Sequence, residues 1–352
     1  MTKNLKTDYG AVTSATLNKA ITDARTYFTS HPNAVYTITI PEGSFSIPDT
    51  IDVSNVQPGP NGQLVITGAG MDHTTIVQSG DTVGILGTNT YRTTFSGIHF
   101  TVPNQTTTQG NVVAVAPGQV TISVPVGFPT PIQVIDPHYD LSQACPQDTA
   151  AAEGWGRYMK VWTDSTTDPH IMDENQSQIA WCKPVAVVGS SSEWTILLKK
   201  DTLVAPYPIG SLISLKSKNM ESAYQFCGGS DFEFKDIKWT ERSRGIWHCS
   251  FNNVHLDGDV IARGPAINGQ VPVLSSPGGG PQLGELGKPS SGHVIENCNF
   301  DATGDDAIAF FDASGSIKNT QVSDAYGRIN LNQNPNVQLS NNTFIRTRVV
   351  KQ

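Results

Sequence analysis

A short motif recurs in the C-terminal part of the chain at a spacing close to 22 residues. It consists of an Asn, two further residues and a large apolar residue, and it occurs at residues 253–256, 297–300, 319–322 and 342–345. The four Asn positions are 44, 22 and 23 residues apart, which corresponds to two, one and one units. Less faithful copies occupy residues 97–100 and 236–239. A unit of this length, with turn residues between short apolar runs, is typical of one coil of a solenoid.

Within a unit, apolar and polar residues alternate, as at residues 294–300 and 307–311. A period of two indicates β-strands with one buried face. Strands this short cannot bury that face alone, so each coil must stack on its neighbours. An Asn at one fixed turn position can then bond the same backbone site in successive coils, which predicts an asparagine ladder. Turn preference would also place Asn between strands, but it does not by itself produce a fixed phase.

The overall composition limits the classes of partner. The 352 residues include 32 Gly and 22 Pro, spread along the chain, which favours many turns between short elements. The formal net charge is -8, so the net field repels phosphate backbones and anionic lipids. We therefore expect neither a nucleic-acid partner nor a membrane. The first residues lack the apolar core of a secretion signal. We expect that the protein is secreted or periplasmic and that its signal was removed; the alternative is a cytoplasmic location.

The N-terminal section has a helical pattern followed by strands. Residues 14–28 place apolar side chains on one helical stripe, with Ser14 as a suitable N-cap. Alternating runs follow at residues 36–40, 44–47 and 64–70. The helix is expected to plug the open end of the solenoid, where the first coil would otherwise expose its apolar interior.

The repeat is interrupted twice. Between residues 102 and 220 the 22-residue phase is lost, and runs such as 119–124, 158–162 and 195–198 indicate an inserted antiparallel β-barrel or sandwich. We therefore divide the chain into an N-terminal cap with the first coils (1–101), the inserted subdomain (102–220) and the main coils (221–352). The second break, residues 264–292, is rich in Gly, Pro and Ser, and a loop of that length in a solenoid is often functional.

Five cysteines occur, at positions 145, 182, 227, 249 and 298, without a CxxC pair or a metal-ligand spacing. We expect them to be small buried hydrophobic residues, with at least one free thiol because their number is odd. No metal, nucleotide or redox cofactor is predicted. The Gly278–Gly280 run has no helix behind it and so does not indicate a phosphate-binding loop.

These features together resemble the right-handed parallel β-helix of the pectin-lyase-like superfamily. Residues 38–45 look like its opening strands, and residues 304–308, which begin with Gly-Asp-Asp, are similar to a motif of its glycoside hydrolases. The resemblance is to the family 110 α-galactosidases, where inserted barrel structure also interrupts the β-helix, and more distantly to the polygalacturonases. It implies an all-β fold and a glycoside hydrolase that acts on an oligo- or polysaccharide, attacks from the chain end and inverts the anomeric centre.

The chain also departs from these patterns. The polygalacturonases have an Asn-Thr-Asp one coil before the paired aspartates, but no aspartate lies between Asp259 and Asp301 here. They have a Gly-His-Gly one coil later, where this chain has residues 325–329. These departures leave the identity of the general acid open.

The resemblance points to Asp305 and Asp306 as the acid/base pair. Glycoside hydrolysis needs one protonated carboxyl and one carboxylate, and two neighbouring acids cannot both ionise easily. Asp324 is a third catalytic candidate, because it occupies a matching position about one coil later. The alternative is that Gly-Asp-Asp is a hydrophilic turn and that Asp324 is structural.

Substrate-binding candidates come from both neighbouring coils and from the long loop. Sugars require flat apolar faces and planar donors. On these grounds we predict contacts to substrate from Arg244, Trp247, His248, Glu285, Tyr326 and Arg328. Each has a structural alternative, such as a core Trp, an exposed Arg, or an Arg that only pairs with the aspartates.

Two other functions fit the same pattern. A polysaccharide lyase or uronate epimerase needs a base and a cation, which Arg244, His248 and Arg328 could provide. A non-catalytic carbohydrate-binding β-helix is the third reading. The oligomeric state stays open, a homodimer included.

Overall fold

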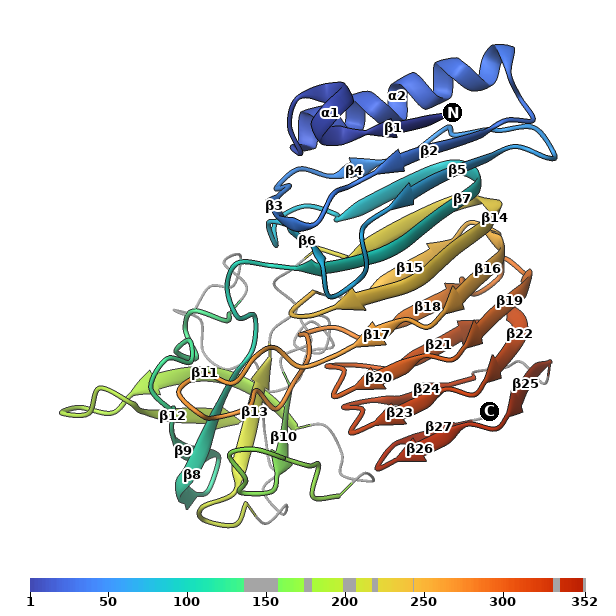
Figure 1. Cartoon of the computed structure of the whole chain (residues 1–352). Coiled ribbons are helices and arrows are strands. Elements are labelled where there is room, and N and C mark those ends of the chain that lie inside the picture. The colour runs from blue at the N-terminus through green and yellow to red at the C-terminus, as the bar shows by residue number, and fades with distance from the viewer. Residues whose placement is uncertain are drawn as a thin grey trace.

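The computed structural model describes residues 1–135, 158–173, 179–198, 207–216, 221–242, 244–331 and 336–350. Most of these residues wind into a parallel β-helix, and a separate antiparallel barrel projects from its side (Figure 1). Most coils contribute one strand to each of three columns, two long strands run through all three, and neighbouring strands within a column are parallel. The predicted all-β parallel β-helix is therefore confirmed.

The first column carries the longest strands. It contains β1 (Thr2–Asn4), β2 (Val35–Thr39), β5 (Gln63–Thr67), the middle of β7 (Ile85–Thr101) and of β14 (Tyr224–Trp239), β16 (Asn252–Asp257), β19 (Ser290–Glu296), β22 (Ala313–Lys318) and β25 (Val337–Ser340).

The second column faces the barrel. It contains β3 (Gly43–Ser46), β6 (Thr74–Val77), the ends of β7 and β14, β17 (Val260–Ile261), β20 (Asn299–Asp301), β23 (Gln321–Ser323) and β26 (Thr343–Ile345).

The third column carries the candidate site. It contains β4 (Ile51–Asp52), the beginnings of β7 and β14, β15 (Gly245–His248), β18 (Pro281–Gly284), β21 (Ile308–Phe311), β24 (Arg328–Asn330) and β27 (Arg348–Val350).

Stacked apolar side chains fill the interior of the coils. In the first column one buried ladder runs in register through Ile66, Phe95, Phe234, Leu256, Ile295 and Ile317. Alternate residues of a strand point to opposite faces, so this ladder fixes which neighbouring side chains face solvent. The inside-outside assignment in every coil then follows from the register.

The turn between the first and second columns uses a left-handed residue in each coil. Asn297, Asn319 and Asn341 hold this position, with φ of 56°, 47° and 54°. The Asn319 Nδ2 donates to Asn297 Oδ1 at 3.4 Å, and Asn297 Nδ2 donates to Asp257 Oδ1 at 2.7 Å. Side-chain hydrogen bonds therefore link neighbouring turns, but not all of the four predicted Asn residues occupy this turn position. Position 341, not 342, belongs to the series, and Asn253 lies within β16, whose following turn uses Gly258 instead.

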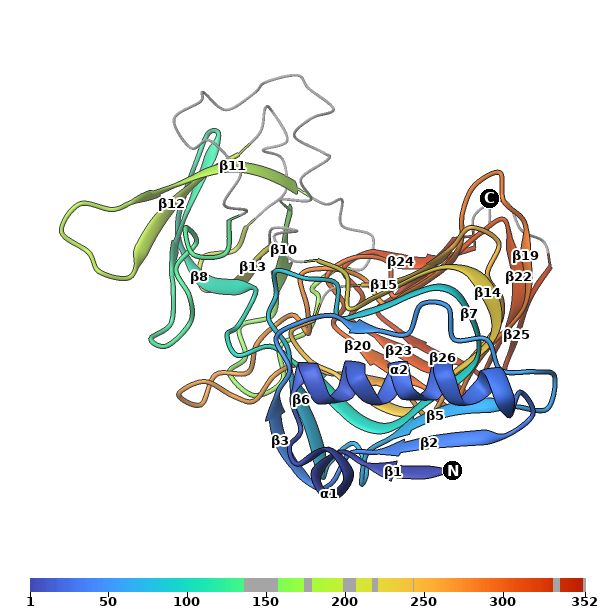
Figure 2. The ribbon, with the colours of Figure 1, turned by 90° about the horizontal axis from the view of Figure 1, so that it is seen from above.

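Helix α2 (Ser14–Ser30) follows the short helix α1 (Leu5–Tyr9) and lies across the N-terminal end of the coils (Figure 2). It buries Leu17, Ile21 and Phe28 in the main core, as predicted. Its N-cap is Thr13 rather than Ser14, because Thr13 and Thr16 form a reciprocal capping box. This helix covers apolar surface that the first coil would otherwise expose.

The strands between β7 and β14 close into a six-stranded antiparallel barrel. In spatial order these are β8 (Thr108–Ala116), β9 (Gln119–Ser123), β12 (Glu193–Leu198), β11 (Ile179–Ala186), β10 (Tyr158–Trp162) and β13 (Leu212–Lys216). Of the two arrangements that the sequence left open, the structure has the barrel.

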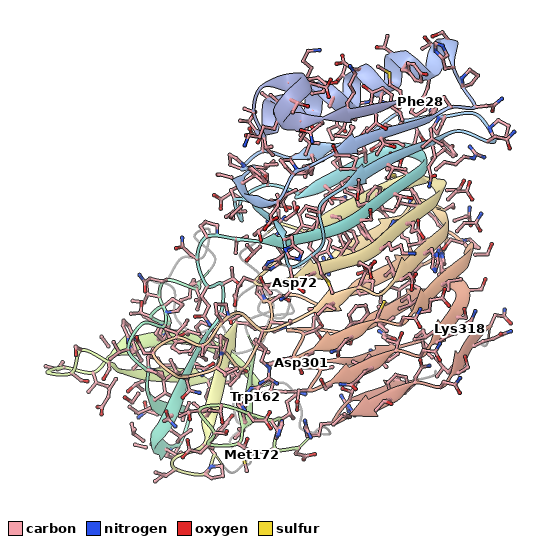
Figure 3. All side chains as sticks on the ribbon, viewed as in Figure 1. Phe28, Asp72, Trp162, Met172, Asp301 and Lys318 are labelled. Carbon is pink, nitrogen blue, oxygen red and sulfur yellow. A yellow bond between two sulfur atoms is a disulfide. The ribbon has the colours of Figure 1, made fainter. Side chains whose placement is uncertain are left out.

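The barrel packs against the β-helix through a small apolar cluster that includes Trp162, Leu212, Leu274 and Tyr326. Arg263 extends across this junction, with its guanidinium 5.6 Å from the Trp162 ring centre and its Nε 2.8 Å from Asp301 Oδ2. Figure 3 labels Trp162 and Asp301 at the facing edges of the two parts. Packing and charge together fix the barrel beside the second column.

One ion cluster on the outer face of the first column predicts a pH-dependent stability. His255 lies 2.9 Å from Glu296 Oε1 and 3.4 Å from Glu233 Oε1, and the hydrogen bonds to Glu233 and Glu296 raise the His255 pKa to about 9, against an opposing effect of burial. Because this folded-state pKa exceeds the unfolded value of about 6.5, the stabilisation is complete below that value and is lost as pH rises through about 9. We therefore expect His255→Gln to lower the melting temperature most in mildly acidic buffer, with a difference that shrinks as pH rises through about 9. Glu296→Gln should lose part of the same pH dependence, whereas a pH-independent difference would contradict this assignment.

Candidate active site

Asp305 and Asp306 lie in the turn between β20 and β21, where the chain enters the third column. Both are partly exposed and line a cavity of about 180 Å³. The other walls are Arg244, residues 279–282, Ala309 and Phe311. The two predicted acids therefore face a cavity and reach solvent.

The Gly-rich loop forms one wall of this cavity by close backbone approach. A Cβ atom at Gly279 would lie 2.3 Å from the carbonyl oxygen of Asp306. Only Gly permits such an approach without displacing the turn that carries Asp305 and Asp306. The long loop that interrupts the repeat thus contacts the paired aspartates directly.

The two carboxyl groups have different surroundings. The backbone N–H of Asp306 donates to Asp305 Oδ1 at 3.0 Å. Asp306 Oδ2 accepts from Asn330 Nδ2 at 2.9 Å, and its Oδ1 lies 3.7 Å from Arg328 Nε. Burial and the charge of Asp305 raise the Asp306 pKa, whereas Asn330 and Arg328 act in the opposite direction. This shift favours the protonated form of Asp306, which is the form that a proton donor requires.

The cavity also offers the side-chain types that bind sugars. Arg244 lines the cavity, and no side-chain hydrogen bond or ion pair is seen for it within the part of the chain that the structure describes. Phe311 is partly exposed and presents an apolar ring. Of the predicted substrate contacts, Arg244 lines the cavity and Arg328 lies beside Asp306. The sequence prediction did not include Phe311, which lines the cavity, or Asn330, which donates to Asp306. Their signal was the alternation within β21 and β24, where these two residues point outward from the coil.

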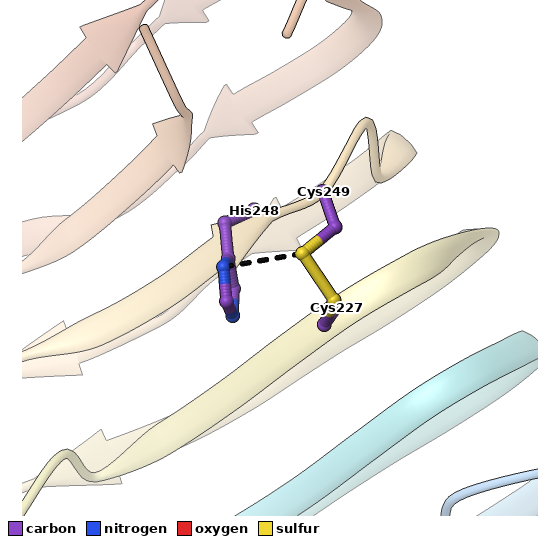
Figure 4. A group of neighbouring side chains, drawn as sticks. All are labelled: Cys227, His248 and Cys249. Carbon is purple, nitrogen blue, oxygen red and sulfur yellow. Dashed lines mark hydrogen bonds between the residues drawn. A yellow bond between two sulfur atoms is a disulfide. The ribbon is translucent and has the colours of Figure 1, made fainter.

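His248 and Glu285 lie outside this cavity. They are at the C-terminal ends of β15 and β18 in the same column. His248 Nδ1 is 3.3 Å from Cys249 Sγ (Figure 4) and 3.7 Å from Glu285 Oε2. Glu285 also forms an exposed ion pair with Lys288 at 3.1 Å. The structure therefore gives both residues local partners and does not bring them to the paired aspartates.

Two predicted aromatic contacts are wrong. Trp247 is 0% exposed, with its ring 4.5 Å from Tyr224 and 5.7 Å from Phe226 inside the coils. Tyr326 is also 0% exposed, and the ammonium groups of Lys160 and Lys216 lie 5.2 and 4.4 Å from its ring centre. Neither ring has a surface that a saccharide could contact.

Asp324 is likewise not a catalytic candidate in this structure. It is 2% exposed and forms hydrogen bonds with Arg346 at 2.7 and 2.8 Å and with the backbone N–H of Ile171 at 3.0 Å. His170 and Arg263 lie within 3.5 Å of the same carboxylate. Burial raises the Asp324 pKa, but the hydrogen bonds from Arg346 and Ile171 and the charges of Arg346 and Arg263 together outweigh it, so that the pKa is lowered. The carboxylate connects the barrel segment to the coils and is not among the residues that line the cavity of Asp305 and Asp306.

Two of the cysteines are also not free hydrophobic residues. Cys227 and Cys249 form a disulfide between neighbouring coils, and Cys298 is free and buried (Figure 4). Cys145 and the side chain of Cys182 lie outside the described residues. The sulfur atoms of the disulfide lie close to His248, but they are bonded to each other and are not thiolates that could ligate a metal.

No helix in the described ranges is long and apolar enough to cross a membrane.

Comparison with known proteins finds likeness at the level of structure alone. No family model matches the sequence, and no curated protein matches it. The chain is similar to Geobacillus virus E2 ORF18, with a TM-score of 0.46, 8% identity, and coverage of 97% of this chain and 48% of that one. It is similar to the catalytic domain of Agl-KA, with a TM-score of 0.43, 13% identity, and coverage of 98% and 46%.

A third similar structure is the alginate lyase of Paenibacillus sp. str. FPU-7. Its TM-score is 0.37 and its identity 8%, with coverage of 100% of this chain and 97% of that one. The chain spans about half the length of the first two proteins. At these identities and TM-scores the likenesses assign no activity, and the fold rests on the strand pairings described above.

Proposed function

We propose that this protein is a carbohydrate-active enzyme, and specifically a glycoside hydrolase that uses Asp305 and Asp306 as its acid/base pair. The observation that carries the proposal is that the two acids share one solvent-reaching cavity with Arg244 and Phe311. The carboxyls are the groups that glycoside hydrolysis requires, and the ring and guanidinium are groups that bind sugars.

The raised pKa of Asp306 supports a proton-donor role for that residue, and we propose the complementary role for Asp305. Asp306, protonated, donates its proton to the glycosidic oxygen as the bond from that oxygen to the anomeric carbon breaks. Asp305, ionised, accepts a proton from the water whose oxygen bonds to the same carbon. The products are two hydroxyl-bearing sugars, and the two carboxyls then exchange their protons with solvent.

The substrate is proposed to enter with its chain end. The loop that carries Gly279 closes one side of the cavity, which favours a terminal sugar over an internal one. Together with the resemblance of residues 304–308, this supports an exo-acting, inverting enzyme on an α-galactoside or a related sugar. NMR tests inversion directly, because it shows which anomer of the product sugar appears first.

Product analysis tests the reaction class. The protein is incubated with a panel of neutral glycosides and uronate polymers, and both reducing ends and the absorbance of unsaturated uronates are recorded. New reducing ends without that absorbance support hydrolysis. An unsaturated product would instead identify a lyase, with Arg244 and Arg328 near the acids as its cationic groups. Binding without either product would leave a non-catalytic carbohydrate-binding β-helix.

The disulfide bears on the compartment. A disulfide persists in oxidising surroundings, which supports a secreted or periplasmic location. We expect Cys227 and Cys249 to resist alkylation in denaturant until a reductant is added, as peptide mass spectrometry would show. Cys298 should be labelled in denaturant with or without reductant. Labelling of Cys227 and Cys249 without reduction would contradict both the bond and the proposed compartment.

A further inference from the structure

A second cavity lies where the first coils meet the barrel. Its volume is about 280 Å³, and its walls are the 79–81 turn after β6, the 102–106 segment that leads into β8, and Gln133. It shares no lining residue with the cavity of Asp305 and Asp306. It is therefore a separate site on the molecule.

Buried Glu241 holds one wall of this cavity. Its Oε2 accepts hydrogen bonds from the backbone N–H and the hydroxyl of Thr106, each at 3.1 Å. The same hydroxyl is 3.1 Å from the Glu241 carbonyl oxygen. Glu241 is only 7% exposed, and a buried carboxyl is costly unless it is hydrogen-bonded. These contacts fix the backbone immediately next to Gln105.

Arg242, the next residue, holds the opposite wall. It is 2% exposed and donates to the carbonyl oxygens of Ser79 at 2.7 Å, Ser222 at 3.0 Å and Thr82 at 3.4 Å. Two consecutive buried charged side chains thus fix the two walls of one cavity. Such positioning reduces the ordering cost of binding a ligand.

The Gln105 amide is the group that points to a ligand. It lines the cavity, and both Nε2 and Oε1 are buried without a hydrogen-bond partner among the described residues. A primary amide offers two donor hydrogens and an acceptor oxygen. Buried polar groups in folded proteins are almost always satisfied, so an amide held in this way is suited to a ligand that both donates and accepts.

The other side chains define the ligand class. Asp81, Asn104 and Gln133 add donors and acceptors, and Val102 and Pro103 add apolar contact. Among the described residues that line the cavity, none is Lys, Arg or His, so an anionic ligand has no counter-charge. One carboxylate is also too few for a metal site. The remaining chemistry is that of a neutral, hydroxyl-rich molecule.

We propose that this cavity binds a neutral saccharide unit at a site distinct from the paired aspartates. The site binds without performing chemistry, so it extends the proposed function and does not depend on turnover. A chain held here would be anchored to the same molecule that carries the acid pair, which raises its effective concentration at that pair.

Ligand-observed NMR on the whole chain tests the proposal. The probes are glucose, galactose, mannose and N-acetylglucosamine, with galacturonate as the anionic comparison. We expect at least one neutral sugar to bind saturably to the wild type and to the Asp305→Asn/Asp306→Asn protein. Gln105→Leu should weaken that binding by about tenfold, since it removes both hydrogen-bonding groups at nearly constant shape. Gln338→Leu, on the exposed face of β25, is the matched control and should bind like the wild type.

Asp81→Asn provides a second variant, since Asp81 is exposed on a turn and its replacement should not affect folding. This substitution should weaken the binding of the same sugar by a few-fold. Equal binding by Gln105→Leu, Asp81→Asn and Gln338→Leu would overturn the proposal, as would the absence of saturable binding by every neutral sugar. Loss of activity in the Asp305 and Asp306 variants with sugar binding retained would separate this site from the proposed active site.

Discussion

Asp305→Asn and Asp306→Asn each lower turnover of the cleaved saccharide by about 10²- to 10⁴-fold, which is the usual contribution of a positioned acid or base. The melting temperature should stay nearly unchanged, because both side chains are partly exposed and lie in a turn outside the coil core. Turnover is measured with the substrate that the product analysis identifies. A matched control is Asp312→Asn in the next turn, which accepts from the Gly287 N–H and does not line the cavity.

The pH profile separates the two roles. Because Asp306 must be protonated to donate, turnover should fall as pH rises through its raised pKa. The Arg328→Gln variant removes a nearby positive charge that opposes this rise, so it should move the alkaline limb to higher pH. Retained turnover in both Asn variants would remove the pair from the chemistry, whatever the shape of the profile.

The fold was predictable because the repeat is regular in the part of the chain where coils are shortest. Asn297, Asn319 and Asn341 share one left-handed turn position, and the hydrogen bond from Asn319 to Asn297 follows from that period. The closed form of the inserted barrel was not predictable, since a sandwich has the same alternation along each strand.

The spacing of Cys227 and Cys249 in the sequence already indicates the disulfide, although it was not predicted. Cys227 and Cys249 are separated by 22 residues, which is one coil. Residues one coil apart stack at the strand spacing, and the Cα–Cα distance of 4.9 Å lies within the range that a disulfide requires. A cysteine pair at the repeat length is therefore a bridge candidate in any solenoid.

The errors at the site have a different cause. Trp247 pairs in register with Phe226 and Leu283, both apolar and buried, so its inward direction follows once the coils are aligned. The predicted loop over residues 264–292 is too long, because it includes β18 and the start of β19. The segment before β18 lengthens that coil and hid the alignment. Asp324 has its main partner, Arg346, 22 residues later, again one coil away. Its contact with Ile171 comes from the inserted barrel, and no spacing in the sequence reveals a contact between separately folded parts.

The structure of this junction leads to the largest expected effect on stability. Asp324→Ala removes the carboxylate that Arg346, Arg263 and the Ile171 N–H share, and it leaves Arg263, whose side chain is 10% exposed, with Asp301 as its remaining ion partner. Breaking one side of a buried ion pair costs about 3–5 kcal/mol. We expect a loss of that size in the free energy of unfolding, measured by denaturant titration.

The same carboxylate predicts how the loss depends on pH. Its folded pKa is lowered, so its stabilisation is present above the unfolded pKa and is lost as pH falls through the folded one. The difference between the wild type and Asp324→Ala should therefore persist at neutral pH and shrink in acid. Asp168→Ala is the matched control, because that side chain pairs with His170 in the same cluster but is 75% exposed. It should cost about 1 kcal/mol or less. If Asp324→Ala instead abolished turnover at unchanged stability, Asp324 would be part of the chemistry and the assignment of this cluster to the barrel junction would be wrong.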